Sequence, residues 1–362
     1  MPEIHKHWMQ IALTEAMKAL GNTHPNPAVG AVIVRDGQVL GKGFTQACGG
    51  NHAEVEALQT AGDGQLHLSG ATLYVTLEPC AAQGRTPACT SAIIPSGIST
   101  VVYASSDPNP KMAGGAQVLA DAGIEVVANV CQAEADSLNR PFLHFMATNM
   151  PWLIAKAALS LDGKMATRTG HSQWISGVES RKHSHGVRAM CDAIVVGVGT
   201  LVHDNPSLTV RDATIIGKPP LRVMLGKHTP ELFEDCKLLS DEAPSRFYVT
   251  QDDANAQAWR DKGMDVIVVE DYTTAFKHLA NDGCLQVLLE GGGKLHGACF
   301  EAKISNELLI YQAPLLIGGT EAMSFWHGLG VETMQDVLHI ESIEREILGA
   351  DMLIRGDIVY PA

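Results

Sequence analysis

Basic residues and long apolar runs are scarce in this chain of 362 residues. Lys and Arg number 26 against 40 Asp and Glu, which gives a formal net charge of −14 at pH 7. A protein that grips a polynucleotide needs basic side chains for the phosphates, so this balance argues against a nucleic-acid partner and for a small substrate. No apolar run approaches the roughly 20 residues that a membrane helix needs, so we expect no membrane partner.

A short, evenly stapled disulfide framework is also missing, although the chain has eight cysteines. That usage is typical of a reducing compartment, and the first residues lack the apolar core of a signal peptide, so we expect a cytoplasmic protein. A composition with 46% hydrophobic and 18% charged residues indicates a folded globular chain, long enough for two domains. Six cysteines are expected to be small buried apolar residues: Cys48, Cys131, Cys191, Cys236, Cys284 and Cys299.

The most informative pattern consists of His52, Glu54, Cys80 and Cys89. One imidazole and two thiolates hold a zinc ion and leave its fourth position open for water. A carboxylate two residues from the histidine can move protons at that water without binding the metal, as in zinc deaminases. Two points stay open, since eight residues rather than two separate the cysteines, and Cys48 is near enough in sequence to close the site as a fourth ligand.

Local patterns place these residues on expected elements. A helix is predicted directly after His52, and the apolar run 71–77 is predicted to be a buried strand that leads into Pro79 and Cys80. A proline followed by a cysteine fits the start of a helix. We therefore predict that the positive end of a helix dipole favours a thiolate at Cys80.

The first half of the chain predicts a three-layer α/β domain, because strands alternate with helices. Strands at 29–35 and 39–44 are joined by Asp36-Gly37, a strong hairpin signal. The other predicted elements are helices at 3–20, 116–122 and 132–145 and strands at 100–104 and 124–127.

A boundary is predicted at Met150-Pro151, which gives domains at 1–149 and 150–362. The strand and helix pattern begins again there, so a second α/β domain follows. Ser176 and Glu179 have the spacing of a capping box that opens a helix. Further strands are predicted at 152–156, 192–197, 221–225, 247–250, 266–269, 286–289 and 308–312, and further helices at 272–280 and 295–302.

Two glycine clusters follow predicted strands of the second half, at 197–200 and 290–293. Glycines there let backbone N–H groups approach a phosphate, and plain tight turns explain them as well. Neither cluster completes Gly-x-Gly-x-x-Gly, so a Rossmann fingerprint is not supported. The stretch 204–211 is predicted to be a polar loop entering a strand, with Arg188 and Arg211 either as two-pronged phosphate ligands or as solvated surface charges.

Motifs of one family run through both halves. In the first half they are His24-Pro25-Asn26-Pro27-Ala28-Val29-Gly30, His52-Ala53-Glu54-Val55, Thr76-Leu77-Glu78-Pro79-Cys80, Gly84-Arg85-Thr86-Pro87 with Cys89, and Asp107-Pro108-Asn109-Pro110. In the second half they are Lys156, 160–164, 172–175, Arg188-Ala189, 192–194, 197–200, 204–211, 290–293, Ala313-Pro314 and Gly318-Gly319. By these motifs nearly the whole chain resembles the bifunctional deaminase–reductase of riboflavin biosynthesis, which also has the long gap between its cysteines.

The resemblance implies an N-terminal domain like cytidine deaminase and a C-terminal domain like dihydrofolate reductase. The first would deaminate 2,5-diamino-6-ribosylamino-4(3H)-pyrimidinone 5′-phosphate. The second would reduce the ribosyl group to ribityl, giving 5-amino-6-(5-phospho-D-ribitylamino)uracil. The implied cofactors are Zn²⁺ and NADPH, and we expect a homo-oligomer.

In the deaminase, the resemblance implies zinc on His52, Cys80 and Cys89. Glu54 would take the proton of water and pass it to the ring nitrogen and the leaving ammonia. Four residues are implied to contact the substrate, the first at its pyrimidine and the second at its phosphate: Asn26, Arg85, Asp107 and Asn109.

In the reductase, hydride would pass from the nicotinamide to C1 of an opened ribosyl imine. The implied cofactor residues are Ala158, Trp174, Thr200, Asp204, Gly292, Gly293, Lys294, Leu295, His296, Gly297 and Ala298. The implied substrate residues are Ser172, Arg188, Leu208, Arg211 and Glu290, with the arginines on the phosphate. Core packing is the ordinary alternative for Trp174, and solvation is the alternative to a cofactor phosphate for Lys227.

Three positions depart from the family pattern. The family often has Cys-Ser-His where this chain has Cys80-Ala81-Ala82, a histidine at the position of Thr45 and an aspartate at that of Gly226. The first two weaken the inference of substrate contacts but not that of zinc, because all three ligands and Glu54 remain.

Two other hypotheses compete with this one. A deaminase of free or RNA-borne cytosine or adenine is opposed by the net charge of −14 and by the motifs of the second half. A structural zinc module needs four protein ligands, and Cys48 is the candidate for the fourth.

Overall fold

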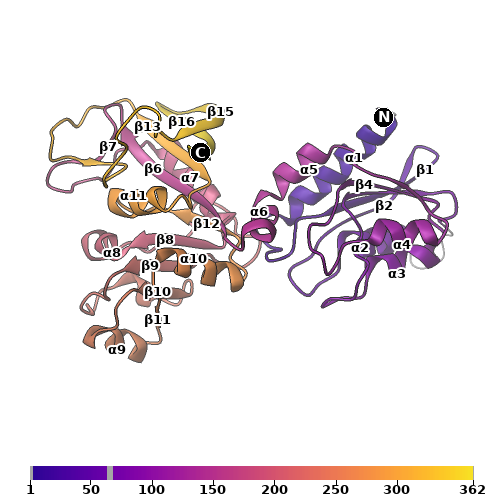
Figure 1. Cartoon of the computed structure of the whole chain (residues 1–362), viewed down its shortest axis with the longest axis horizontal. Helices are drawn as coiled ribbons and strands as arrows, with labels where there is room; N and C mark the ends of the chain where they lie inside the picture. Colours follow the sequence, from indigo (N-terminus) through magenta and orange to yellow (C-terminus); the bar gives the residue numbers. More distant parts are fainter. Residues whose placement is uncertain (1–2, 63–67, 362) are drawn as a thin grey trace. The chain divides into compact units, whose positions relative to one another are not determined.

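The computed structural model describes residues 3–62 and 68–361, which group into two compact units, Met1–Thr148 and Asn149–Ala362. Each unit is built on its own sheet with helices on both faces (Figure 1). The α/β class predicted from the alternation of strands and helices is therefore confirmed. In the described part of the chain, no helix is both long and apolar enough to span a bilayer.

The first unit has a sheet of five strands: β1 (Gly30–Arg35), β2 (Gln38–Phe44), β3 (Thr72–Leu77), β4 (Thr100–Ser105) and β5 (Glu125–Val127). Their order in the sheet is β2-β1-β3-β4-β5. β1 pairs antiparallel with β2 and β3, whereas β3, β4 and β5 run parallel. The predicted hairpin and the predicted strands before Cys80 and at 100–104 are thus confirmed.

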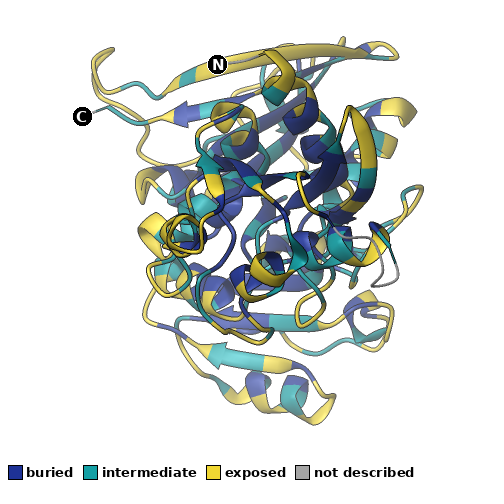
Figure 2. Cartoon of the chain, turned by 90° about the vertical axis from the view of Figure 1, so that its right-hand side faces the viewer, coloured by how far each residue is buried: buried dark blue, intermediate teal, exposed yellow. Residues whose placement is uncertain are grey.

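Helices cover both faces of this sheet: α1 (Glu3–Ala16), η1 (Met17–Ala19), α2 (Ala53–Thr60), α3 (Cys89–Ile93), η2 (Ile94–Ser96), α4 (Gly115–Asp121), α5 (Gln132–Leu138) and α6 (Arg140–Thr148). Val32 and Val102 face α1 and α5, while the alternate residues Ile33 and Val101 face α2, α3 and α4. Both faces of the central strands are therefore buried (Figure 2), as a sheet between two helical layers requires.

The single helix predicted over 132–145 is wrong, because the chain breaks at Asn139 between α5 and α6. Pro141, at the start of α6, has no N–H to continue the ladder of α5. The Asn139 side chain accepts the N–H of Ala28 at 2.8 Å and donates to the Ala28 carbonyl at 2.9 Å. The break thus fastens the loop that carries Asn26 to the helical layer.

The second unit has a sheet of nine strands: β6 (Trp152–Ser160), β8 (Ala193–Gly197), β9 (Leu221–Gly226), β10 (Ser245–Val249), β11 (Asp265–Val268), β12 (Gln286–Leu289), β13 (Glu307–Ala313), β15 (His339–Leu348) and β16 (Asp351–Val359). The order is β11-β10-β9-β8-β12-β6-β13-β16-β15, parallel from β11 to β13 and antiparallel beyond. A separate two-stranded ladder joins β7 (Lys164–Ala166) to β14 (Met323–Ser324).

The helices of this unit are α7 (Val178–Ala189), α8 (Val198–Asp204), η3 (Lys237–Leu239), α9 (Ala254–Asp261), α10 (Tyr272–Asn281) and α11 (Gly293–Glu301). α10 and α11 pack on one face of the sheet and α7, α8 and α9 on the other. The prediction of a loop entering a strand at 204–211 is wrong, since Asp204 ends α8 and the next strand begins at Leu221. The helix that precedes this loop, α8, has only seven residues, which is too short for a clear apolar period in the sequence.

The predicted capping box at Ser176 is also wrong. Gly177 is the N-cap of α7, and as a glycine it has no side chain to cap the helix. The cap comes from Asp351 of β16, whose carboxylate accepts the N–H of Gly177 at 2.7 Å and the hydroxyl of Ser180 at 2.6 Å. A local spacing rule missed it because the capping group is distant in sequence.

The paired hydrogen bonds of Asn139 make it a test of the fold. We expect Asn139→Ala to lower the unfolding free energy of the first unit by about 2 to 4 kcal/mol, because a buried N–H and C=O of Ala28 lose their partner. Differential scanning calorimetry of the intact chain should show this loss of stability as a lower transition temperature for the first unit alone. Gln117→Ala, which removes an exposed contact with Asp121, should leave that transition in place, and equal effects of the two changes would contradict the assignment.

Candidate functional sites

Three side chains from separate segments meet in the first unit. His52 is the N-cap of α2, Cys80 follows β3, and Cys89 is the first residue of α3. Nδ1 of His52 lies 3.1 Å from Sγ of Cys89 and 3.7 Å from Sγ of Cys80, and all three donor atoms lie within 4.8 Å of one another. Zinc with Zn–S of about 2.3 Å and Zn–N of about 2.0 Å in a tetrahedron separates its ligands by about this much. The donor set and its spacing therefore fit zinc.

A helix that begins at Pro79-Cys80 is not found, so that prediction is wrong. Cys80 lies in a loop, and the helix begins at Cys89, nine residues later. The N–H of Cys89 nevertheless donates to Sγ of Cys80 at 3.2 Å. The start of α3 thus reaches the Cys80 sulfur across the long loop between the two cysteines.

The two sulfurs titrate as a pair. The hydrogen bond between the two cysteine side chains lowers the pKa of the Cys80 thiol to about 4, while the same side-chain bond, together with burial, raises the pKa of Cys89. Without a metal the pair therefore holds on to one proton. A divalent cation displaces such a proton, because metal ligation requires the thiolate.

Glu54 lies on the first turn of α2 and is only 4% exposed. Burial raises the pKa of this carboxyl group. The hydrogen bond with Cys80, and then the charge of Glu54, raise the pKa of His52. The hydroxyl of Thr86 lies 3.3 Å from Nε2 of His52, the ring nitrogen that is not next to the sulfurs. Thr86 therefore orients the imidazole, a role that the motif did not reveal.

The other residues predicted for this site lie on loops around it. Arg85 is exposed and its guanidinium contacts Sγ of Cys48. Cys48 is itself exposed, so its predicted burial is wrong, and it lies outside the donor group of the described residues. The remaining three are half-buried: Asn26, Asp107 and Asn109.

Two of the departures from the family pattern have a structural account. Thr45 is buried, and its hydroxyl accepts the Val29 N–H at 3.2 Å and donates to the Val29 carbonyl at 3.4 Å. Thr45 therefore hydrogen-bonds the backbone of the residue directly before β1. A Cβ on Gly226 would come within 2.5 Å of Cγ2 of Val198, so an aspartate does not fit at that position beside Val198. Nothing in the structure explains Ala82.

A cleft of about 1980 Å³ opens in the second unit at the ends of β8, β9 and β12 and along β6. Cβ atoms built on Gly199 and Gly292 would meet nothing within 4 Å, so both glycines border open space, as a site for an extended phosphate-bearing cofactor requires. The cleft brings together most of the predicted residues: Ala158, Ser172, Trp174, Arg188, Thr200, Asp204, Leu208, Arg211, Glu290, Gly292, Gly293, Lys294 and Leu295.

Three predicted cofactor residues do not line this cleft: His296, Gly297 and Ala298. They lie within α11 beyond its first turn, where the helix turns them away from the cleft. His296 is fully buried, with its ring 4.6 Å from that of Phe325 and stacked on Phe300. Only the start of α11 thus faces the cleft.

An ion pair lies at the floor of the cleft. Arg188 donates to both carboxylate oxygens of Glu290, at 2.7 and 2.6 Å, and to the carbonyl of Thr209 at 2.9 Å. Burial would raise the pKa of Glu290, but the charges of Arg188 and Lys156 outweigh it and lower that pKa to about 2. Burial also lowers the pKa of Lys156. The two-pronged face of Arg188 is therefore occupied by Glu290.

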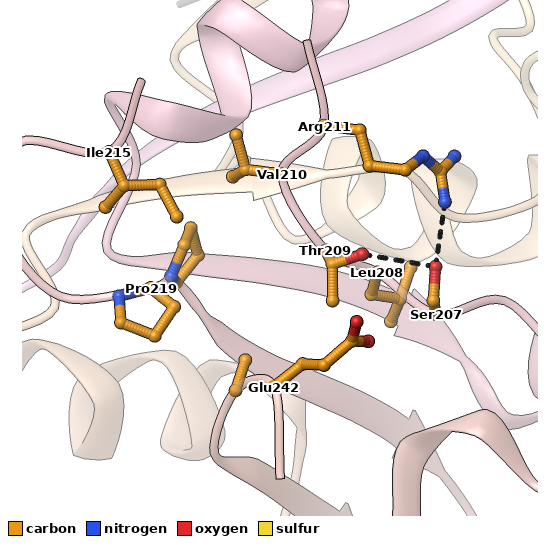
Figure 3. A pocket seen from close by; sticks show the side chains of 10 residues that line it. Ser207, Leu208, Thr209, Val210, Arg211, Ile215, Pro219 and Glu242 are labelled. Atoms are coloured by element: carbon orange, nitrogen blue, oxygen red, sulfur yellow. Dashed lines mark hydrogen bonds between the residues drawn. The ribbon is translucent and has the colours of Figure 1, made fainter. Parts of the chain in front are cut away.

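The cleft wall at 207–211 is shared with a smaller cavity of about 480 Å³ (Figure 3). Buried Leu208 anchors this segment, and Arg211 donates to the Ser207 hydroxyl at 3.0 Å. Arg211 is exposed, so its guanidinium is more accessible than that of Arg188. Trp174 is 66% exposed, with the guanidinium of Arg181 4.8 Å from its ring centre, so it is not a core residue.

Comparison with known proteins assigns both units. Residues 2–105 match the cytidine and deoxycytidylate deaminase zinc-binding region, and residues 151–354 match the RibD C-terminal domain. The chain is similar to the riboflavin biosynthesis protein RibD of Aquifex aeolicus, with 39% identity over 97% of this chain and 98% of the relative. It is equally similar to that of Bacillus amyloliquefaciens, with 39% identity over 99% of each.

Solved structures agree along the whole chain. RibD of Acinetobacter baumannii superposes with a TM-score of 0.89 and 35% identity, covering 98% of this chain and 99% of that one. A diaminohydroxyphosphoribosylaminopyrimidine deaminase/5-amino-6-(5-phosphoribosylamino)uracil reductase from Thermotoga maritima superposes with a TM-score of 0.86 and 29% identity, covering 99% of both. The chain belongs to the bifunctional deaminase–reductase family of riboflavin biosynthesis, whose cofactors are zinc and NADPH.

Proposed function

We propose that residues 1–149 deaminate the diamino-ribosylamino-pyrimidinone phosphate and that residues 150–362 reduce the ribosyl group of the product. The observation that carries the first half is the donor group His52, Cys80 and Cys89 with buried Glu54 beside it. The second half is supported by the cleft that gathers the glycine turns, the ion pair and Arg211.

We propose His52, Cys80 and Cys89 as the zinc ligands. Zinc bound there supplies a Lewis acid that brings the pKa of water to near 7. Glu54 would take one proton from that water and deliver it to the pyrimidine ring nitrogen, and would then pass a second proton, from the hydroxyl group added to the ring, to the departing ammonia. Its burial suits this cycle, because the raised pKa lets the carboxyl hold a proton between the two transfers.

The substrate is proposed to lie against four side chains around the metal site. Asn26 hydrogen-bonds the pyrimidine, and its loop is fastened through Asn139. Arg85, exposed on the loop between the cysteines, meets the phosphate. Asp107 and Asn109 form a further wall of the site.

For the reductase, we propose that NADPH lies along the cleft and supplies hydride to C1 of the opened ribosyl imine. The glycine turns before α8 and α11, which line the cleft, would hold its phosphates through backbone N–H groups. Ala158, Trp174, Thr200 and Asp204 complete this wall.

Five cleft residues are proposed to hold the pyrimidine ribosyl phosphate: Ser172, Arg188, Leu208, Arg211 and Glu290. Because Arg188 already pairs with Glu290, its contribution is to keep that carboxylate ionised and in place. Arg211 is left as the main partner of the phosphate.

We also propose that the chain forms a homo-oligomer. β15 is the outermost strand of its sheet, and Ile343 and Ile347 are 42% and 68% exposed on it. A long edge strand with apolar side chains is a surface that a second chain covers.

Glu54→Gln tests the proton transfer. We expect kcat of deamination to fall about 100-fold to 10,000-fold, because the amide cannot carry a proton between water and the ring. Ammonia release measures it, while metal analysis should show zinc retained and NADPH oxidation on the deaminated substrate should be unchanged.

Two cysteine variants are the controls for that experiment. Cys89→Ser should lose zinc together with activity, whereas Cys48→Ser should keep both, since Cys48 lies outside the donor group. Normal turnover by Glu54→Gln, or loss of zinc from Cys48→Ser, would refute these roles.

Arg211→Ala tests phosphate recognition in the reductase. The KM for the deaminated ribosyl phosphate should rise about tenfold to a hundredfold, the loss expected for one charge-assisted contact. Steady-state NADPH oxidation measures it, with Lys262→Ala, an exposed charge beyond α9, as the control. An unchanged KM would exclude Arg211 as the phosphate ligand.

The β15 edge gives a separate test of assembly. Sedimentation velocity of the 38.6 kDa chain should show a multiple of that mass, and Ile347→Lys should shift it toward the single chain, because a charge at the contact opposes edge pairing. Monomeric wild-type protein would rule out the oligomer, and an oligomer unaffected by Ile347→Lys would place the contact elsewhere.

A further inference from the structure

One buried carboxylate of the first unit has no part in the proton transfer described above. Glu78 lies between β3 and Cys80 and is 8% exposed. One of its oxygens, Oε2, accepts the N–H of Asp107 at 3.3 Å. The other, Oε1, accepts the N–H of Gly114 at 3.2 Å and that of Ala116 at 3.0 Å. Backbone donors from one chain segment, residues 107–116, thus surround this carboxylate.

Two more contacts hold the same segment, called here the 107–116 strap, against the residues next to Cys80. The N–H of Ala81 donates to the carbonyl of Met112 at 2.9 Å. A Cβ on Gly115 would come within 1.7 Å of the Pro79 carbonyl oxygen, so only glycine permits this approach. The strap is therefore fastened on both sides of Cys80, from Glu78 and from Ala81.

The strap carries two of the four residues proposed to contact the deaminase substrate. The Asp107 carboxylate accepts the N–H of Asn109 at 2.9 Å, and the Asn109 side-chain oxygen accepts the N–H of Lys111 at 3.1 Å. The bonds from Asp107 to Glu78 and from Ala81 to Met112 hold this segment against the chain on either side of Cys80, a proposed metal ligand. Whatever fixes the strap therefore fixes Asp107 and Asn109 relative to that ligand.

We propose that Glu78 is a positioning residue of the deaminase, whose carboxylate fastens the 107–116 strap so that Asp107 and Asn109 form one wall of the substrate site. This role rests on the proposed function of the first unit. Glu78 acts through backbone hydrogen bonds rather than on the reacting atoms. Loosening it should weaken substrate binding and leave the metal and Glu54 in place.

Glu78→Gln tests this with little change in volume. The amide keeps one acceptor oxygen, but its NH₂ then faces an N–H donor, so either Asp107 or the pair Gly114 and Ala116 loses its partner. We expect hydrogen exchange of the strap amides to accelerate about tenfold. The KM of deamination should rise about tenfold, with kcat within about threefold of wild type and zinc content unchanged.

Glu125→Gln, the same change on an exposed residue of β5, is the matched control and should alter none of these quantities. Unchanged exchange and KM in Glu78→Gln overturn the proposal, as does a loss of zinc or a fall in kcat at constant KM. If Glu78→Gln does not fold, Glu78→Asp keeps the charge one methylene short of the strap, and an unchanged KM in that variant overturns the proposal equally.

The failure of the underlying function would look different. Wild-type protein that releases no ammonia from the pyrimidine phosphate would refute the deaminase assignment, whatever Glu78→Gln does. Active wild-type protein with a Glu78→Gln variant of wild-type KM and exchange would refute the positioning role alone.

Discussion

The short distance between the sulfurs of Cys80 and Cys89, with the His52 imidazole beside them, is the constraint on which the first unit depends. The fold holds three donor atoms so close to a common point that the protonation of each one affects the others. The hydrogen bond between the Cys80 and Cys89 side chains lowers the pKa of the first thiol and raises that of the second. Such a cluster is poised to exchange its remaining proton for a divalent metal, and the surrounding loops, Thr86 and the 107–116 strap are arranged around that point.

The cleft of the second unit also depends on the balance of charges among its residues. It must accept two phosphate-bearing molecules in a chain whose net charge is −14. In the proposed function, glycine turns at helix starts would offer backbone N–H groups to these phosphates without adding charged side chains, together with a few cations. Glu290 stays ionised in a buried position because Arg188 and Lys156 compensate it, so the floor of the cleft sets two cationic side chains against one carboxylate.

Much of this arrangement could be predicted from the sequence, and the exceptions have three different causes. The proposed metal ligands, Glu54 and the central strands follow from local motifs and apolar runs, and the structure brings the three donor atoms within 4.8 Å of one another. Three features depend on a contact between separate segments of the chain. They are the break at Asn139, the cap that Asp351 gives α7, and the hydrogen bond from the start of α3 to the Cys80 sulfur. The β15–β16 hairpin was missed because β15 is exposed along most of its length and shows no apolar alternation. The resemblance implied the whole segment 292–298 as cofactor residues, whereas His296, Gly297 and Ala298 do not line the cleft, because the helix turns them away from it.

The close approach between Gly226 and Val198 couples two positions that lie 28 residues apart. A side chain at position 226 requires a smaller residue at position 198, so Gly226 cannot change alone without strain. Evolutionary or engineered routes from this chain toward an acidic residue at the end of β9 must therefore pass through a compensating change in α8 first. Epistasis of this kind makes a single substitution grafted from a relative an unreliable guide to what that residue contributes there.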